Sequence, residues 1–318
     1  MSSADEVVGS KPGLPPIGWR SAGLALLTVV LWGANPVALR YSLDVFPPIF
    51  VAGLRFALAA LFMFAWCRLE GVSIGLRPGQ WRPCLFAGLG LFIQIGTFNL
   101  GANLTSSSHT SMLINTFIFW VLLMEHVVTK VDRITARKAW GLVLASCGVV
   151  LILSTESVRG GRDPQLDPPG FIGDLILLFS ALVFAWNVVY VKHALKWVEP
   201  SKLIFWHDVV AVVLFFLWSA TTESLSGARL TPVATIAIIY QGLFVGGICF
   251  AVQTLLLRRH SASQIAVFSF ATPLVGVTLG VLLRGDQPTP WLFVSALCVA
   301  VGIVLVNVRI EPTNRKMN

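Results

Sequence analysis

Charged side chains are scarce in this sequence. Asp, Glu, Lys and Arg make up 12% of the 318 residues, whereas hydrophobic residues make up 56% and the mean hydropathy is +0.79. Soluble domains carry roughly 25% charged residues, so this chain has too few charges to cover a water-exposed surface. The segment 21–39 has no charged residue, and about 20 apolar residues in a helix cross the hydrocarbon core of a bilayer. The composition predicts an all-α integral membrane protein.

Cysteine, histidine and enzyme motifs are equally sparse. The five cysteines stand in or beside apolar runs without C-x-x-C spacing, which is typical of small buried residues. The five histidines are scattered, and G-x-S-x-G, P-loop and H-E-x-x-H motifs do not occur. We therefore expect no metal site, no cofactor and no enzymatic activity.

Apolar runs separated by polar or turn-forming residues predict ten transmembrane helices. Residues 1–20 are polar and rich in Pro and Gly, and we expect them to form a disordered tail, with a second short tail at 309–318. The longest connection, 155–170, contains three prolines and divides the chain near its middle. The expected spans are 21–43, 47–67, 83–104, 108–127, 136–154, 171–191, 203–221, 233–257, 262–283 and 290–308.

The basic residues predict the orientation of these spans. If the N-terminus is cytoplasmic, 17 of the 23 Lys and Arg fall on the cytoplasmic side, 5 fall outside, and Arg55 lies within a span. This bias is what the positive-inside rule produces, so both termini are expected in the cytoplasm and segment 155–170 in the periplasm. The net charge of +8 then reflects topology and contact with anionic lipid head groups, not binding to nucleic acid.

An internal repeat divides the chain into two halves, 21–154 and 171–308. A shift of 152 residues superposes Asn35 on Asn187 and Pro48 on Pro200. A shift of 154 superposes further positions, among them Gly88 on Gly242, Ser107 on Ser261, Asp132 on Asp286 and Gly148 on Gly302. Each half holds five spans, an odd number, so the second half must enter the membrane in the opposite direction. Such inverted repeats are typical of secondary carriers, which bind substrate near the midplane between the halves.

Polar residues inside spans are the candidate substrate-binding residues, because burying them in lipid is costly unless they face protein or water. Trp32 and Asn35 share one helix face, and Asn187 with its neighbour Trp186 is the counterpart in the second half. The repeat also pairs Asn99 with Gln253. Each of these polar groups could instead form a helix–helix hydrogen bond. The full candidate set is Trp32, Asn35, Gln94, Asn99, His109, Asn115, Trp186, Asn187 and Gln253.

Charged residues are missing from the expected midplane. Glu125, Asp174 and Asp208 lie near the ends of spans, and Arg55 is the deepest cation. A path for organic cations would offer a carboxylate, and one for phosphate-bearing solutes would offer a cluster of Lys or Arg. A neutral or zwitterionic solute held by amides and aromatic faces fits this pattern best.

Several motifs resemble those of the EamA-type carriers of the drug/metabolite transporter superfamily. They are Trp-Gly-Ala-Asn at 32–35, Leu-Arg-Phe at 54–56, and the hairpins Val-Asp-Arg-Ile-Thr at 131–135 and Gly-Asp-Gln-Pro-Thr at 285–289. Both hairpins carry Asp where the family signature has Glu, and this departure leaves the substrate open. The resemblance covers about residues 21–308 and implies a ten-helix carrier in which each half is one EamA-like repeat. Members include amino-acid exporters and carriers of other metabolites.

The sequence thus predicts a multi-pass carrier of the bacterial inner membrane that moves small neutral or zwitterionic metabolites by alternating access. Amino acids are the first choice of substrate, and net export is favoured. A sugar or nucleotide-sugar carrier is the alternative within transporters, and a polytopic membrane enzyme is the alternative from another class. The lipid bilayer and a small solute are the expected partners, and the sequence leaves the oligomeric state open.

Overall fold

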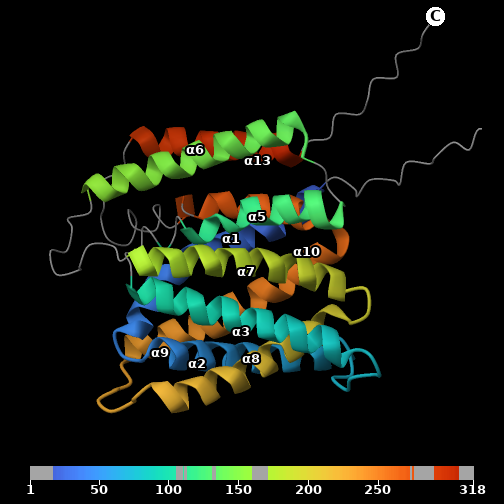
Figure 1. Cartoon of the computed structure of the whole chain (residues 1–318), viewed down its shortest axis with the longest axis vertical. Coiled ribbons are helices and arrows are strands. Elements are labelled where there is room, and N and C mark those ends of the chain that lie inside the picture. The colour runs from blue at the N-terminus through green and yellow to red at the C-terminus, as the bar shows by residue number, and fades with distance from the viewer. Residues whose placement is uncertain are drawn as a thin grey trace, which may run out of the picture.

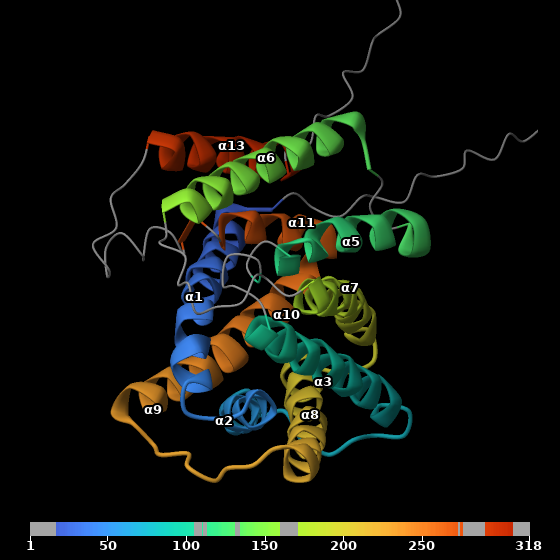
Figure 2. The same ribbon diagram turned by 60° about the vertical axis from the view of Figure 1, so that its left-hand side comes forward.

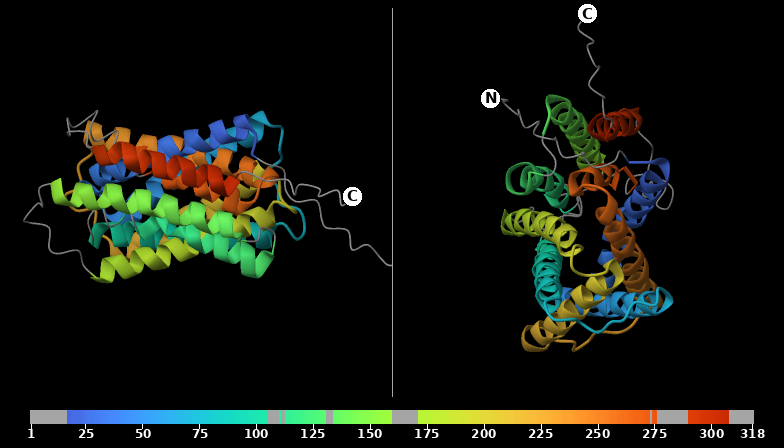
Figure 3. Two further views of the ribbon diagram at one scale, coloured as in Figure 1. Left: turned by 90° about the horizontal axis from the view of Figure 1, so that it is seen from above. Right: turned by 90° about the vertical axis from the view of Figure 1, so that its right-hand side faces the viewer.

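The structure is a computed structural model, and it describes residues 17–104, 110, 113–130, 134–159, 171–272, 274–275 and 290–307. All regular elements within these residues are helical, as the sequence predicts. The axes of the long helices are roughly aligned in a single bundle (Figures 1 and 3). They are α1 (Trp19–Leu43), α2 (Pro48–Leu69), α3 (Trp81–Leu104), α6 (Ala136–Arg159), α7 (Phe171–Ala194), α8 (Pro200–Thr222) and α13 (Pro290–Asn307).

Shorter elements complete the described fold, and several differ from the expected uninterrupted spans. The run 232–259 is continuous but contains a π-helical stretch, and the span expected from 262 changes to a 3-10 helix after one turn. Such interruptions depend on how neighbouring helices pack, which helical periodicity does not report. The elements are α5 (Phe117–Met124), η1 (Glu125–Thr129), α9 (Pro232–Ile239), η2 (Tyr240–Cys249), α10 (Phe250–Arg259), α11 (Ala262–Ala266) and η3 (Val267–Ala271).

Five described helices are long and apolar enough to cross a membrane: α2, α3, α8, Ile172–Ala194 of α7, and the continuous run Pro232–Arg259. Large apolar side chains lie on the outside of the bundle. Leu61 on α2 is 65% exposed and Leu217 on α8 is 61% exposed. An apolar exterior around apolar helices fits a surface in contact with lipid, so the chain is a multi-pass membrane protein.

Equivalent helices of the two halves begin at positions separated by the offset of the sequence repeat. Trp19 and Phe171, which begin α1 and α7, are 152 residues apart, and so are Pro48 and Pro200, which begin α2 and α8. Proline favours the first position of a helix, because its missing N–H would have no partner there. The starts of α6 and α13 are 154 residues apart.

The repeat-related helices α2 and α8 pack against each other in opposite directions. Phe50 near the start of α2 contacts Phe216 near the end of α8, with ring centroids 5.9 Å apart. Phe64 near the end of α2 contacts Phe205 near the start of α8, at 6.1 Å. The two members of this pair therefore run antiparallel, as an inverted repeat requires.

A second repeat-related pair, α6 and α13, lies at one edge of the bundle (Figures 1 and 2). The pair touches through glycine: a Cβ atom added to Gly302 would lie 2.6 Å from the Gly141 carbonyl oxygen and 2.7 Å from the Ala145 Cβ. Only a residue without a side chain allows the two backbones to approach this closely.

Candidate functional site

Aromatic rings from both halves meet in the middle of the bundle. Phe250 on α10 lies 6.2 Å from Trp32 on α1, 6.0 Å from Phe56 on α2 and 5.6 Å from the His207 ring on α8, measured between ring centroids. Figure 2 shows α10 passing between α1 and α7, which explains how one side chain contacts so many elements. We call Trp32, Phe56, Phe184 and Phe250 the central aromatic cluster.

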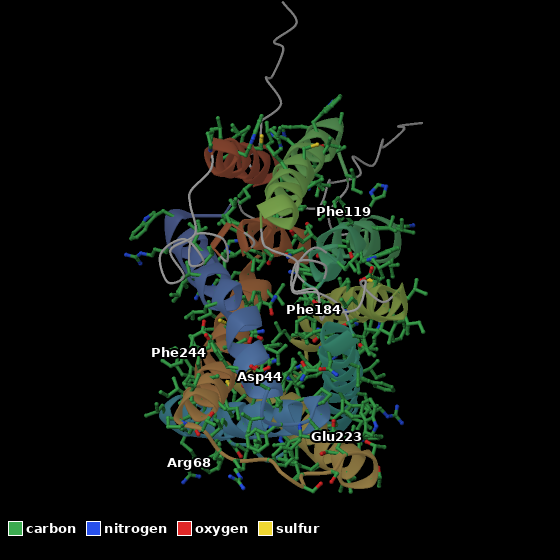
Figure 4. All side chains as sticks on the ribbon, turned by 90° about the vertical axis from the view of Figure 1, so that its left-hand side faces the viewer. Asp44, Arg68, Phe119, Phe184, Glu223 and Phe244 are labelled. Atoms are coloured by element: carbon green, nitrogen blue, oxygen red, sulfur yellow. The ribbon has the colours of Figure 1, made fainter. Side chains whose placement is uncertain are left out.

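The repeat brings two of these rings into direct contact. Trp32 and Phe184 are related by the 152-residue shift, and their ring centroids lie 6.5 Å apart in an edge-to-face arrangement. Phe184 also contacts Phe117 on α5, at 4.4 Å. Figure 4 shows Phe184 in the interior of the bundle, whereas Arg68 and Phe244 lie at its periphery. The cluster therefore lies where the two halves face each other.

Two buried amides stand beside this cluster. Asn35 and Asn187 each follow a cluster aromatic by three residues on the same helix, and they are 9% and 4% exposed. In each of them the side-chain Oδ1 is buried, and none of the described residues donates a hydrogen bond to it. A buried carbonyl oxygen without a donor is costly, so these two oxygens are suited to accept hydrogen bonds from a bound solute.

A histidine–aspartate pair lies next to Asn187. His207 and Asp208 on α8 are fully buried, and His207 Nδ1 lies 2.9 Å from Asp208 Oδ1. The other ring nitrogen of His207 lies 3.5 Å from Asn187 Nδ2. Gly90 on α3 leaves room for Trp186 and Asn187, because a Cβ atom there would lie 2.7 Å from the Trp186 ring and 3.0 Å from Asn187 Oδ1.

Arg55 on α2 is buried beside the cluster. The side chain is 2% exposed, and its guanidinium carbon lies 5.1 Å from the centroid of the Phe56 ring. Neither Nε nor Nη1 of Arg55 finds an acceptor among the described residues. A cation over an aromatic face gains some stabilisation, but the ring cannot replace the hydrogen bonds that water would have given.

The remaining predicted residues divide into several groups. Asn99 donates from Nδ2 to the Pro48 carbonyl oxygen at 2.8 Å, which ties α3 to the start of α2. Trp186 is 39% exposed and stacks on Tyr190 at 5.0 Å, away from the central cluster. Gln94, Asn115 and Gln253 are buried, and His109 lies outside the described residues.

Two glutamates join the halves at the ends of the bundle. The Glu125 carboxylate accepts hydrogen bonds from the backbone N–H groups of Ala262 and Ser263, at 2.8 and 2.9 Å. The Glu223 carboxylate accepts in the same way from the N–H groups of Ile49 and Phe50, both at 2.8 Å. Each carboxylate thus satisfies the first N–H groups of a helix in the other half.

The end capped by Glu125 carries further polar contacts. Lys192 on α7 donates from Nζ to the carbonyl oxygens of Leu257, at 3.0 Å, and His260. His260 Nε2 in turn lies 2.9 Å from the hydroxyl of Ser21 on α1. These bonds connect α1, α7 and the end of α10 at this end of the bundle.

Comparison with known proteins identifies the family. Residues 19–154 and 171–308 each match the EamA-like transporter family. The chain belongs to this family. The motif resemblance in the sequence is thereby confirmed, and EamA-like transporters are membrane carriers of two such repeats.

Individual EamA-like relatives span nearly the whole chain. The uncharacterized transporter YoaV of Bacillus subtilis is 24% identical over 287 residues, which cover 89% of this chain and 95% of the relative. A probable amino-acid metabolite efflux pump of Escherichia coli is 26% identical over 289 residues, covering 89% and 93%. One crystal structure, 17% identical, superposes with a TM-score of 0.76 over 90% of this chain and 96% of that one, and shows likeness of fold.

Proposed function

We propose that this EamA-like protein is a secondary transporter that exports small neutral or zwitterionic metabolites, amino acids first among them, across the bacterial inner membrane. The observation that carries the proposal is the repeat-related pair Asn35 and Asn187, whose buried oxygens receive no hydrogen bond from any described residue and which lie one helical turn from the contacting rings of Trp32 and Phe184. A solute with N–H donors and an apolar body complements such a site. The relatives named as probable amino-acid metabolite efflux pumps support the same substrate class.

The proposed topology has ten membrane-spanning helices in two inverted halves, 21–154 and 171–308. A periplasmic linker at 155–170 joins the halves, and the tails 1–20 and 309–318 lie in the cytoplasm. The two family matches fall on nearly the same segments, and the antiparallel packing of α2 with α8 supports inversion. The asymmetry of Lys and Arg supports the cytoplasmic termini.

Alternating access is the proposed mechanism. The halves touch at the centre through Trp32 and Phe184 and at the two ends through the caps of Glu125 and Glu223. Rocking of one half against the other would release one cap while the other holds, so that the centre opens to one face at a time.

Counterflow in proteoliposomes tests the proposal. Vesicles containing the purified chain and loaded with an unlabelled amino acid should take up the same labelled amino acid faster than protein-free vesicles, with saturable kinetics. Parallel vesicles loaded with sugars or nucleotide sugars test the alternative substrate classes. Recovery of the label in a new compound would indicate an enzyme, and saturable uptake of sugars alone would overturn the amino-acid assignment.

A further inference from the structure

Arg55 is a buried cation, and two of its three guanidinium nitrogens have no acceptor among the described residues. Its Nε and Nη1 atoms are buried and lack an acceptor among the described residues, although a guanidinium carries five N–H donors. Structural arginines inside membrane proteins pair with carboxylates or backbone carbonyl oxygens, because an unpaired buried charge is costly. A purely structural role for Arg55 therefore leaves its environment unexplained.

The buried carboxylates of the described chain do not pair with Arg55, and most of their oxygens bond other groups. Glu125 binds the first N–H groups of α11, and Glu223 binds those of α2. Asp208 is bonded through Oδ1 to His207, while its buried Oδ2 has no hydrogen-bond partner among the described residues. None of these acids forms an ion pair with Arg55.

A short path of rings leads from Arg55 to the centre of the bundle. Arg55 stands over Phe56, Phe56 contacts Phe250, and Phe250 contacts Trp32, which lies one helical turn from Asn35. Arg55 is thus attached to the same aromatic cluster as the proposed solute site. It belongs to α2, an element on which the sequence placed no binding residue.

The unsatisfied atoms around the cluster are of two complementary kinds. Asn35 and Asn187 offer oxygens that need donors, whereas Arg55 offers N–H groups that need an acceptor. The ammonium group of an amino acid supplies donors, and its carboxylate is the acceptor that guanidinium binds best. A phosphate would call for several cations, and no printed contact of the described residues places a second Lys or Arg beside Arg55.

Resting on the transport function proposed above, we propose that Arg55 binds the carboxylate of the transported solute, so that the substrates are α-amino acids rather than amines, amides or sugars. The apolar side chain of the solute then lies against Trp32, Phe250 and Phe184, and its ammonium group lies against the amide oxygen of Asn35, one helical turn from Trp32. Arg55 sets specificity for the carboxylate, because an amide lacks the charge that balances the buried guanidinium.

A binding cycle on the purified full-length chain tests this assignment without requiring transport. The probes are L-phenylalanine, L-phenylalaninamide, which lacks the carboxylate, and N-acetyl-L-phenylalanine, which lacks the ammonium group. The variants are Arg55→Met and Arg55→Lys, with Arg68→Met as the matched control. Arg68 lies on the same helix and also over a phenylalanine ring, at 5.8 Å from Phe64, but its side chain is exposed.

The wild type should bind L-phenylalanine roughly tenfold or more tightly than the amide, because a hydrogen-bonded charge pair is lost with the carboxylate. Arg55→Met should lower the affinity for L-phenylalanine to that for the amide and leave the affinity for the amide unchanged. The effects of removing the arginine and of removing the carboxylate are then not additive. N-Acetyl-L-phenylalanine should keep its dependence on Arg55. Arg55→Lys should bind with intermediate affinity, and Arg68→Met should behave as wild type.

Thermal unfolding without ligand is a second measurement, which distinguishes a loss of binding from a folding defect. Removing an unpaired buried charge should leave the melting temperature of Arg55→Met equal to or above that of the wild type. Equal affinity of the wild type for the acid and the amide would overturn the assignment. It would equally be overturned if chloride stabilised the wild type through Arg55 while the carboxylate probes did not.

The outcomes separate this inference from the transport proposal. Carboxylate binding that depends on Arg55, in a protein that moves none of the solutes in counterflow, would refute transport and leave the site standing. Saturable flux of amino acids and their amides alike, unchanged in Arg55→Met, would refute the site and leave transport standing.

Discussion

Trp32 and Phe184 occupy the same position in the two halves of the chain, and their rings contact each other at 6.5 Å. In a molecule with pseudo-twofold symmetry, two equivalent residues touch only where they lie close to the symmetry axis. The contact therefore marks the axis between the halves. The neighbouring equivalents Asn35 and Asn187 have one feature in common, a buried oxygen that receives no hydrogen bond from the described residues.

Replacing either amide should impair transport more than folding. We expect Asn35→Ala and Asn187→Ala each to raise the KM for counterflow of an amino acid by roughly tenfold, because one hydrogen bond to a charged ammonium group is lost. The melting temperature of Asn35→Ala should change little, since the removed oxygen has no donor among the described residues, whereas Asn187→Ala also removes the 3.5 Å contact of Nδ2 with His207 and should lower it modestly. Asn103→Ala, which changes an exposed amide on α3, should keep the wild-type KM, and equal KM values in all four proteins would remove the amides from the site.

The Glu125 cap should contribute measurably to stability. Glu125→Gln keeps the size of the side chain but removes the charge that binds the N–H groups of Ala262 and Ser263. We expect the free energy of unfolding to fall by about 1–3 kcal/mol, which denaturant titration in detergent can measure. Glu70→Gln, an exposed substitution at the end of α2, should leave the free energy of unfolding within about 0.5 kcal/mol of the wild type. Identical losses in the two variants would contradict a role for the cap.

The α6–α13 contact should tolerate no side chain at Gly302. A Cβ atom there would meet the Gly141 carbonyl oxygen at 2.6 Å, so the backbones must separate. We expect Gly302→Ala to destabilise the protein by about 1–3 kcal/mol, measured by denaturant titration. Gly23→Ala in α1 is the control, because no atom lies within 4 Å of its added Cβ and alanine favours a helix. A stable Gly302→Ala variant would show that the contact is looser than the structure has it.

Sequence patterns predicted a helical membrane chain with an internal repeat, because hydropathy and residue spacing can be read along the chain without knowing which helices are neighbours. They also selected Trp32, Asn35 and Asn187, which the structure places beside one aromatic cluster. They did not reveal that two nitrogens of Arg55 have no acceptor among the described residues or that His207 and Asp208 are fully buried, since both facts depend on neighbouring helices. Burial of the His207–Asp208 pair has a local signal, two adjacent polar residues within an apolar run, and Arg55 was visible as an intramembrane cation.

Trp186 was assigned to the site because of its neighbour in the sequence, and its surroundings differ from those of that neighbour. It is adjacent to Asn187, and the sequence assigned both to the site. Adjacent residues on a helix point about 100° apart, so Asn187 faces His207 while Trp186 stacks on Tyr190 near the surface. Both side chains lie against Gly90 on α3, so their different surroundings are set by the neighbouring helices and not by their adjacency in the sequence.

Thiol labelling in intact membranes tests most directly whether a solute path runs between the halves. In a variant without the five native cysteines, Asn35→Cys and Asn187→Cys are each exposed to a membrane-impermeant thiol reagent, with Leu61→Cys as the lipid-facing control. We expect that both site cysteines react, that L-phenylalanine slows both reactions, and that Leu61→Cys stays unlabelled. Site cysteines that remain as unreactive as the control would contradict such a path.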